Sequence, residues 1–342
     1  MMSKKRVLLI GPNFYYFLQS MQNAFCQLGW EVYLCTYDNP IHPYNAINKI
    51  RYKLSRNKTL LKDISRNKYK QYIESVYSSI SPQLTLIVNG DNLLPETVNF
   101  FAQSSKVGIW LFDSITRMPD TLPNLQYASS VFCYEKEDID SIKQKYGIDA
   151  YFVPQAVDGS MYYKISTPKK WDIVFAGDIF HSIKRKLIVP SIVNHYVNNK
   201  NIRVWGIYKP WFKNPIKWFT REHKGIYKNC NTSFYQLNVD YNEAKVVLNV
   251  HHEQQKNGAN PKVFEIAVTG SYQICDANPY IEQLFPNGEI GIYHNEEELF
   301  ELIDYALSHD MSEQAESARQ IVVNNHTFVN RIQQMLNILY SE

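Results

Sequence analysis

The sequence lacks long hydrophobic runs. Nowhere in its 342 residues do the roughly 18 consecutive apolar residues of a membrane-spanning helix occur. The basic start followed by the apolar residues 7–10 imitates a secretory signal, but this run is far shorter than the hydrophobic region of a signal, and no small-residue cleavage site follows it. We therefore expect a first β-strand at this point and a cytoplasmic protein.

Cysteine is scarce and scattered. The chain has five cysteines, an odd number, and they never form a Cys-x-x-Cys pair (Cys26, Cys35, Cys133, Cys230 and Cys275). This distribution argues against a disulfide framework and against a zinc site. We expect reduced thiols and no metal cofactor.

Net charge is small as well. The 36 basic residues face 33 acidic ones, which leaves +3; this is not the strongly basic balance of a dedicated nucleic-acid-binding protein. With 45% hydrophobic and 20% charged residues, the chain has a globular composition and can bury a sizeable core. At about 150 residues per domain, its length predicts two domains.

Basic residues nevertheless gather in two stretches. The first, residues 49–70, has Lys49 and Lys70 at its ends. The second, residues 208–228, begins at Tyr208, ends at Lys228 and interleaves its lysines with Trp and Phe. Such stretches are as typical of a solvated surface as of one that contacts anionic lipid. Peripheral contact with an anionic membrane through either stretch is therefore one interpretation, whereas no nucleic-acid motif accompanies the charge.

Short apolar runs alternate with helical stretches along the whole chain. This alternation predicts an α/β fold with parallel sheets, in two doubly wound halves of similar size. Strands are expected at residues 6–10, 31–35, 84–89, 107–112, 130–134, 151–153, 172–176, 202–205, 246–250, 272–275 and 290–293. Helices are expected at 14–28, 183–197, 261–269 and from 296 almost to the end. Residues 154–170, which contain two prolines and a glycine, are expected to form a linker.

The turn after the first strand does not carry a dinucleotide-binding fingerprint. That motif needs three glycines, and this turn has only Gly11, followed by Pro12 and Asn13. A classical NAD site is therefore not expected. Gly11 and Asn13 are candidates for contact with a ligand in the crevice beyond the strand ends. A simple strand-to-helix turn explains them equally well.

Residues 257–270 are the most informative segment. Asn260 is a good helix N-cap, Pro261 suits the first helical position, and Gly270 closes the helix. The free N–H groups of such a helix start can hold a phosphate, and Lys262 would add a full charge beside it. Glu265 lies on the same helix face, where its carboxylate can accept both hydroxyls of a ribose. In the other interpretation, these two side chains form an ordinary surface pair.

These residues carry a resemblance to a known family. The stretch NPKVFEIAVTGSYQICD, then LFPNGEIGIYHNEEELFELIDYALSHD and HTFVNRIQQML, resembles the C-terminal domain of GT-B glycosyltransferases, in particular those similar to spore maturation protein CgeB. VGIWLFDS, VFCYEKEDIDSIKQKYG, YFVPQAVD and WDIVFAGDIFHSIKRKLI extend the resemblance over roughly residues 80–340. Lys262 stands where the family more often has Arg. Asn257 stands at the first position of the Glu-x7-Glu pattern of retaining enzymes, so the stereochemistry stays open.

The resemblance implies a GT-B architecture of two Rossmann-like domains that face each other across a cleft. Residues 1–160 would bind the acceptor, residues 161–322 would bind a nucleotide sugar, and residues 323–342 would form a helix that returns to the first domain. His251 is expected to contact the donor rather than a metal. The donor-binding candidates are the strand-end and helix-start residues Gly177, Asp178, Arg185, Gly206, His251, Asn260, Lys262 and Glu265.

Acid–base chemistry is expected from the first half of the chain. Asp113 and Asp91 each follow an apolar strand, and a carboxylate there could take the proton of an acceptor hydroxyl. We rank Asp113 first because its apolar strand would partly desolvate it, although an N-cap role explains either residue as well. Asp138 and Asp140 match an Asp-x-Asp metal motif but fall in a helical run, so we expect a solvated helix face there.

The function expected from these features is metal-independent transfer of a sugar from a nucleoside diphosphate to a surface glycan, a lipid-linked sugar or a protein. Two alternatives remain open at this point. A GT-B-fold epimerase that acts on nucleotide sugars would use the same donor residues. A catalytically silent glycan-binding or assembly protein would keep the fold and lack turnover.

Overall fold

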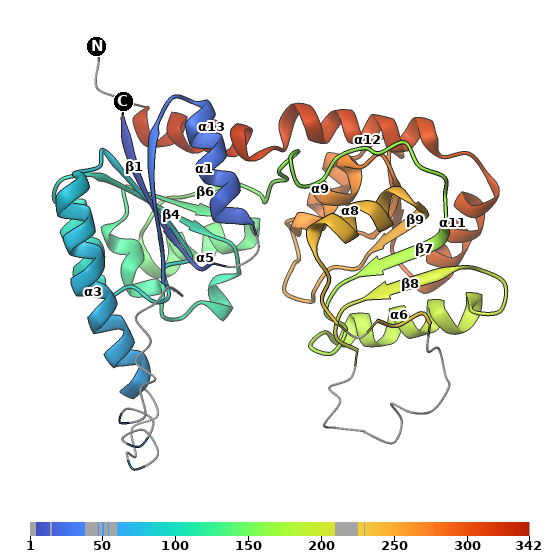
Figure 1. The fold of residues 1–342 in the computed structure, drawn as a ribbon, viewed down its shortest axis with the longest axis horizontal. Coiled ribbons are helices and arrows are strands. Elements are labelled where there is room, and N and C mark those ends of the chain that lie inside the picture. Colours follow the sequence, from blue (N-terminus) through green and yellow to red (C-terminus); the bar gives the residue numbers. More distant parts are fainter. Residues whose placement is uncertain are drawn as a thin grey trace. The chain divides into compact units, whose positions relative to one another are not determined.

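The computed structural model describes residues 5–13, 16–37, 47, 50, 54, 60–208, 225–228 and 230–341. They form two compact units (Figure 1). The first unit comprises Met1–Pro154 and Phe328–Glu342, and the second comprises Gln155–Thr327. The proposed membrane-contacting stretches lie largely outside the described residues, since residues 49, 51–53, 55–59 and 209–224 are not described.

The sheet of the first unit has six parallel strands in the order β2-β1-β3-β4-β5-β6. Its strands are β1 (Arg6–Gly11), β2 (Glu31–Thr36), β3 (Leu84–Val88), β4 (Lys106–Leu111), β5 (Ser130–Cys133) and β6 (Ala150–Phe152). The apolar runs of the four inner strands, β1, β3, β4 and β5, are almost entirely buried, as expected for a sheet covered by helices on both faces.

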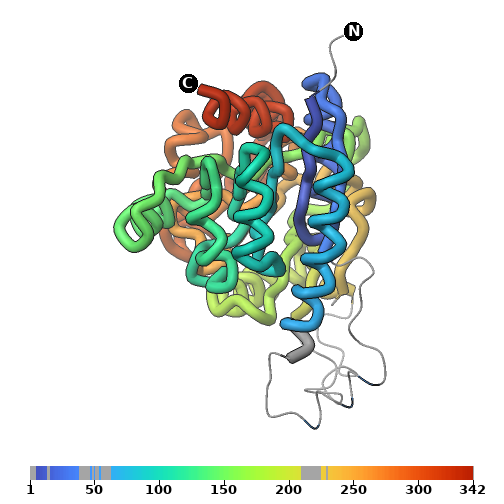
Figure 2. The backbone as a smooth tube through the Cα atoms, turned by 90° about the vertical axis from the view of Figure 1, so that its left-hand side faces the viewer, coloured from blue at the N-terminus to red at the C-terminus, as the bar shows by residue number. Residues whose placement is uncertain are grey.

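Helices cover the two faces of this sheet differently. Alternate strand residues such as Leu8 and Ile10 share one core with α3, α4 and α5, which run side by side in Figure 2. On the other face, α1 contacts α13. These helices are α1 (Phe17–Gln27), α3 (Leu60–Ile80), α4 (Pro95–Ala102), α5 (Lys136–Tyr146) and α13 (Phe328–Tyr340), with short 3-10 helices η1 (Ile115–Arg117) and η2 (Leu122–Tyr127).

The last helix, α13, returns to the first unit as the resemblance implied. Four apolar residues at helical spacing form one stripe on it, and all four are buried (Phe328, Ile332, Met335 and Leu339). A Cβ at Gly108 of β4 would lie 3.5 Å from Leu339, so α13 packs directly on the sheet. The Arg331 guanidinium is buried and donates to the carbonyl of Pro154 at 2.9 Å, where the first unit ends.

The second unit has five parallel strands in the order β11-β10-β9-β7-β8. They are β7 (Trp171–Ala176), β8 (Ile202–Trp205), β9 (Ala244–Asn249), β10 (Tyr272–Asp276) and β11 (Gly291–Tyr293). One core joins this sheet to α6 and α11, whereas α8 and α9 pack on it elsewhere and α12 contacts α9. The helices are α6 (Ile183–Tyr196), α8 (Phe234–Asn242), α9 (Pro261–Val268), α10 (Pro279–Leu284), α11 (Glu296–Ser308) and α12 (Ser312–Asn325).

Two features differ from the sequence-based expectation. The single helix expected from residue 296 onward is three helices, α11, α12 and α13. The expected linker at residues 154–170 belongs to the second unit from Gln155 onward. There Tyr162 is buried and the Tyr163 amide donates to Asn238 of α8 at 3.0 Å, because this irregular segment satisfies its backbone groups with side chains of that helix. Among the described residues, no helix is long and apolar enough to span a bilayer.

Both sheets have a topological switch point, where successive crossovers run in opposite directions along the sheet. It lies between β1 and β3 in the first unit and between β7 and β9 in the second. In open parallel sheets of this kind, the crevice at the carboxyl ends of these strands is the usual place for a ligand. The predicted fold class, two doubly wound α/β units, is confirmed.

Candidate active site

The switch point of the second unit is built on two glycines. Gly177 follows β7 and Gly206 follows β8. A Cβ at Gly206 would lie only 1.9 Å from the Gly177 carbonyl oxygen, and Gly206 has a φ of +118°. Only glycine tolerates this approach and this backbone conformation. Gly206 therefore brings two strand-end loops into contact, which explains its presence without a direct contact to a ligand.

Arg185 spans the switch point. Ser182 caps α6 by accepting a hydrogen bond from the Arg185 amide at 3.2 Å, which fixes the first turn of the helix. The guanidinium then donates through Nε to the carbonyl of Val250, after β9, at 2.8 Å and through Nη1 to the carbonyl of Asp178, after β7, at 3.1 Å. The positive charge thus lies over the carboxyl ends of the two strands that flank the switch point.

The start of α9 is anchored to the same strand end. The Asn260 side chain accepts from the Val263 amide at 3.2 Å, which confirms it as the N-cap. Asn249 is the last residue of β9. Its side-chain amide also exchanges two hydrogen bonds with the side-chain amide of Asn260, at 2.9 and 3.1 Å. The amino end of α9, with its free N–H groups, is therefore held next to the carboxyl end of β9.

Lys262 and Glu265 form a half-buried charged pair on α9. The Lys262 ammonium lies 3.9 Å from the Glu265 carboxylate, and their side chains are 25% and 6% exposed. Loss of water around Lys262 lowers its pKa, and the positive charge of Arg185 lowers it further, while Glu265 acts in the opposite direction. Arg185 binds the residue after Asn249, and Lys262 follows Asn260, the partner of Asn249, so two cationic groups from different helices meet at the carboxyl end of β9.

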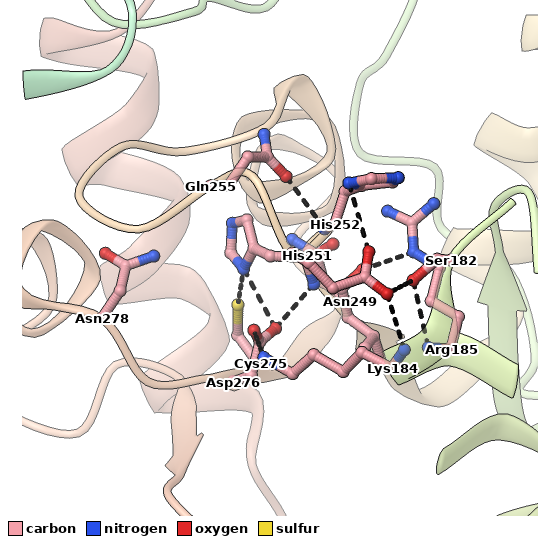
Figure 3. A network of polar contacts seen from close by, with 12 residues as sticks. Ser182, Lys184, Arg185, Asn249, His251, His252, Gln255, Cys275, Asp276 and Asn278 are labelled. Carbon is pink, nitrogen blue, oxygen red and sulfur yellow. Dashed lines mark hydrogen bonds and ion pairs between the residues drawn. The ribbon is translucent and has the colours of Figure 1, made fainter. Parts of the chain in front are cut away.

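The imidazole of His251 is enclosed rather than presented to a ligand. Its exposed fraction is 1%, and its Nδ1 lies 3.0 Å from the carboxylate of Asp276, the last residue of β10 (Figure 3). Asp276 also accepts from the His251 backbone amide at 2.7 Å and forms an ion pair with Lys184. Asp276 thus fixes both the His251 ring and the backbone after β9, and the donor contact expected of His251 stays a prediction.

A cluster of potential metal ligands coincides with this network. His251, Cys275 and Asp276 offer ligand atoms within 4.8 Å of one another, the one such group found in the described parts of the chain. Asp276, however, already has three donors, and burial raises the pKa of the Cys275 thiol and so disfavours the thiolate that a metal needs. The chemistry of these groups fits a hydrogen-bonded network better than a cation site.

The switch point of the first unit holds the acceptor-side candidates. Gly11 ends β1, and a Cβ there would lie 2.9 Å from Leu18 and 3.0 Å from Val88, so close packing already requires glycine. Asn13 is exposed just beyond it. Asp91 follows β3, and its backbone carbonyl accepts from the Arg66 guanidinium. Gly11, Asn13 and Asp91 therefore gather at the two strand ends where a ligand crevice is expected.

Asp113 lies one strand further along, after β4. Its side chain is 36% exposed and lies 3.0 Å from the Arg117 guanidinium, so the carboxylate is only partly shielded from water. The N-cap role belongs to the next residue, because the Ser114 side chain accepts from the Thr116 amide. Asp113 is thus a solvent-accessible carboxylate at the carboxyl edge of the sheet.

The expectation for Asp138 is wrong. Its carboxylate is buried and accepts from the Ser114 hydroxyl at 3.0 Å and from the Ile115 amide at 3.1 Å, whereas Asp140 is exposed. Asp138 therefore anchors the loop that carries Asp113 instead of facing solvent. The helical pattern placed Asp138 on α5, but it could not show that the loop at Ser114 and Ile115 covers this residue.

Solved structures with the same architecture span the whole chain. Sucrose-phosphate synthase from Thermosynechococcus elongatus has a TM-score of 0.68 at 11% identity, over 98% of this chain and 99% of that chain. A glycosyltransferase from Rickettsia africae has a TM-score of 0.65 at 13% identity, over 98% of each chain. Anabaena HepE, solved with UDP and glucose, has a TM-score of 0.63 at 11% identity, over 98% and 99%. At these identities the likeness shows the fold.

Sequence comparison adds a family match for part of the chain. Residues 180–337 match the family model described as glycosyl transferase-like, while no curated protein sequence matches the chain. Residues 180–337 are therefore glycosyl transferase-like in sequence, and the whole chain has the GT-B fold. The family match covers Arg185, Lys262 and Glu265 but does not reach the acceptor-side candidates, because it begins at residue 180 and those lie in the first 113 residues.

Sequence reasoning missed three members of the polar network around Arg185 and the start of α9. Asn249 holds the start of α9 in place. Asp276 holds the backbone after β9, and its ion pair with Lys184 holds the start of α6. Asn249 and Asp276 are polar residues that end otherwise apolar strands, a pattern that singles out Asp91 and Asp113 in the first half of the chain. Lys184 had no such signal, since a lysine in the first turn of a helix is unremarkable.

Proposed function

We propose that this protein is a glycosyltransferase, which takes a sugar from a nucleoside-diphosphate sugar bound by the second unit and transfers it to an acceptor bound by the first unit. The acceptor classes we propose are a surface glycan, a lipid-linked sugar and a protein. The closer relationship to CgeB-like proteins is part of this proposal. HepE, with its bound UDP and glucose, supports the donor class because it shares the fold.

One observation carries the donor assignment. Arg185 and Lys262 bring two positive charges together over the switch point, with a buried carboxylate, Glu265, one turn into α9. A diphosphate would relieve the repulsion between the two cations and neutralise the charge that develops on the leaving group. The Glu265 carboxylate suits the hydroxyls of a ribose. Together these groups match the diphosphate and ribose of a nucleotide, whatever its base.

A thermal-shift screen with UDP-, GDP-, TDP- and CMP-sugars tests this assignment. A ligand that binds only the native state stabilises it by about 2.7 kcal/mol when present at one hundred times its dissociation constant. We expect one nucleotide class to raise the melting temperature and the others to leave it unchanged. If none of the four raises it at millimolar concentration, the donor assignment is wrong.

The affinity for that nucleoside diphosphate is expected to fall as pH rises from neutral toward the ordinary lysine pKa of about 10.4. The lowered pKa of Lys262 means that its ammonium loses its proton below this value, and a phosphate attracts only the charged form. In a Lys262→Arg variant the guanidinium stays charged, so the decline should disappear. Calorimetric titrations at several pH values compare the two proteins; the same decline in both would exclude Lys262 from phosphate binding.

Activity is expected to persist in EDTA without added Mn²⁺ or Mg²⁺. We propose that the positive charges of Arg185 and Lys262 stabilise the leaving diphosphate in the way a divalent cation does in other transferases. The measurement is release of nucleoside diphosphate with and without chelator. Activity that is lost in EDTA and returns with either cation would overturn metal independence.

We also propose a cytoplasmic location with peripheral contact to anionic membrane through residues 49–70 or 208–228. The basis is the basic and aromatic composition of these stretches. Co-sedimentation with vesicles of anionic lipid, compared with vesicles of neutral lipid, tests it. Equal behaviour with both kinds of vesicle would count against membrane contact.

A further inference from the structure

We propose that Asp276 is a positioning residue that holds the donor-binding groups of the second unit in their working arrangement. This inference rests on the proposed function and assigns a role to a residue outside the donor-binding candidates. Asp276 ends β10, next to β9 in the sheet, at the same carboxyl edge as the switch point. Figure 3 shows its carboxylate between Lys184 and His251.

The carboxylate of Asp276 joins three elements. It is 6% exposed, and one oxygen accepts from the amide of His251 at 2.7 Å and lies 3.0 Å from that residue's Nδ1. The other oxygen pairs with the ammonium of Lys184, in the first turn of α6. Burial alone would raise the pKa of Asp276, but His251 and Lys184 outweigh it and hold that pKa well below its usual range. The carboxylate therefore stays ionised and bound to both partners.

Each partner of Asp276 is next in sequence to a residue that either carries or binds the Arg185 guanidinium. Lys184 precedes Arg185 on α6, and His251 follows Val250, whose carbonyl accepts from Arg185 Nε. A second contact works in the same direction, because the Glu253 carboxylate accepts from the Lys184 amide at 2.8 Å. Because Asp276 binds both α6 and the loop after β9, it restricts the Arg185 guanidinium to one position. Such pre-organisation lowers the cost of ordering the site when a ligand binds.

The experiment compares Asp276→Asn with a matched control, Asp172→Asn. Asp172 also pairs with a lysine, Lys245, at 2.9 Å and accepts from a backbone amide, that of Asn201. It lies near the start of β7, so it is at the opposite edge of the same sheet. The control thus removes a comparable ion pair far from the switch point, and any general effect of losing one should appear in both variants.

We expect Asp276→Asn to weaken binding of the nucleoside diphosphate identified in the thermal-shift screen by about tenfold or more, within the range for breaking a buried charged pair. Asp172→Asn should change it less than about twofold. Lys184→Met, which breaks the ion pair from its more exposed side, should weaken binding too. A variant with both Asp276→Asn and Lys184→Met should bind the nucleotide no more weakly than Asp276→Asn alone, because both substitutions remove the same contact. Normal affinity in both folded Asp276→Asn and Lys184→Met would overturn the proposal.

Two further measurements distinguish this inference from the proposed function and from a metal site. Hydrogen exchange needs no ligand: amides of residues 178–186 and 250–256 should exchange faster in Asp276→Asn than in wild type and be unchanged in Asp172→Asn. Unchanged exchange there would overturn the inference even if nucleotide binds, and faster exchange would support it even if no nucleotide binds. Cys275→Ser should leave binding unchanged. Loss of binding in that variant, with one equivalent of metal in the purified wild-type protein, would replace the ion-pair network by a metal site.

Discussion

Replacement of Asp113 by Asn is expected to reduce turnover about 100-fold or more, the usual scale for loss of a general base, with donor affinity near normal. The carboxylate lies at the carboxyl edge of the first unit's sheet, partly exposed, where it can accept the proton of an acceptor hydroxyl. Asparagine keeps the shape and cannot take the proton. The measurement is release of nucleoside diphosphate in the presence of acceptor, together with a binding titration of the donor.

A matched control is Asp140→Asn, an exposed carboxylate on α5 of the same unit. It should leave turnover unchanged. Arg117 lies 3.0 Å from the Asp113 carboxylate, so an acceptor hydroxyl would share that carboxylate with a guanidinium. If Asp113→Asn retains wild-type turnover, the assignment fails, and Asp91, at the switch point itself, becomes the next candidate.

Replacement of Glu265 by Ala is expected to weaken nucleotide binding by about 1–3 kcal/mol, the range for hydrogen bonds that involve a charged group. This corresponds to roughly 5- to 150-fold in the dissociation constant. The buried carboxylate is proposed to accept the ribose hydroxyls, and it also supports the charged form of Lys262. Both effects act in the same direction, and calorimetric titration with the nucleoside diphosphate measures their sum.

Glu289→Ala provides the control for Glu265. Glu289 is equally buried, at 5% exposure, but it accepts from Asn287 in the turn before β11, at the amino end of that strand. Loss of a buried carboxylate there should affect stability and not nucleotide affinity. Unchanged affinity in a folded Glu265→Ala protein would remove Glu265 from the site.

The sequence predicted those parts of the fold whose signals are local. Buried strands appear as short apolar runs, and α9 is marked by a cap, a proline and a closing glycine within eleven residues (260–270). Helix α8 lacked such signals because it buries polar residues, among them Asn238, Asp240 and Asn242. Oxygens of these side chains accept from amides of the irregular segment after Gln155 and from the Trp205 indole, contacts that no sequence period reveals.

The same distinction applies to the site. Lys262 and Glu265 could be paired from the sequence because they are three residues apart on one helix. Asp276 could not be linked to its partners, which lie 25 and 92 residues away and meet it only because β10 is placed next to β9 in the sheet. Likewise, the surroundings of Asp113 depend on a loop held by Asp138, 25 positions later, and the apolar strand before Asp113 does not reveal that contact.

The return of α13 makes the first unit discontinuous and the second an insertion within it. The chain passes between the units at two peptide links, 154–155 and 327–328. Residues 155–327 are therefore one uninterrupted segment that contains a whole sheet and its helices. Residues 1–154 are not a whole unit, because they lack the helix that covers Gly108 and binds Pro154. During synthesis, the whole second unit is therefore made before α13, which the first unit needs to complete its core.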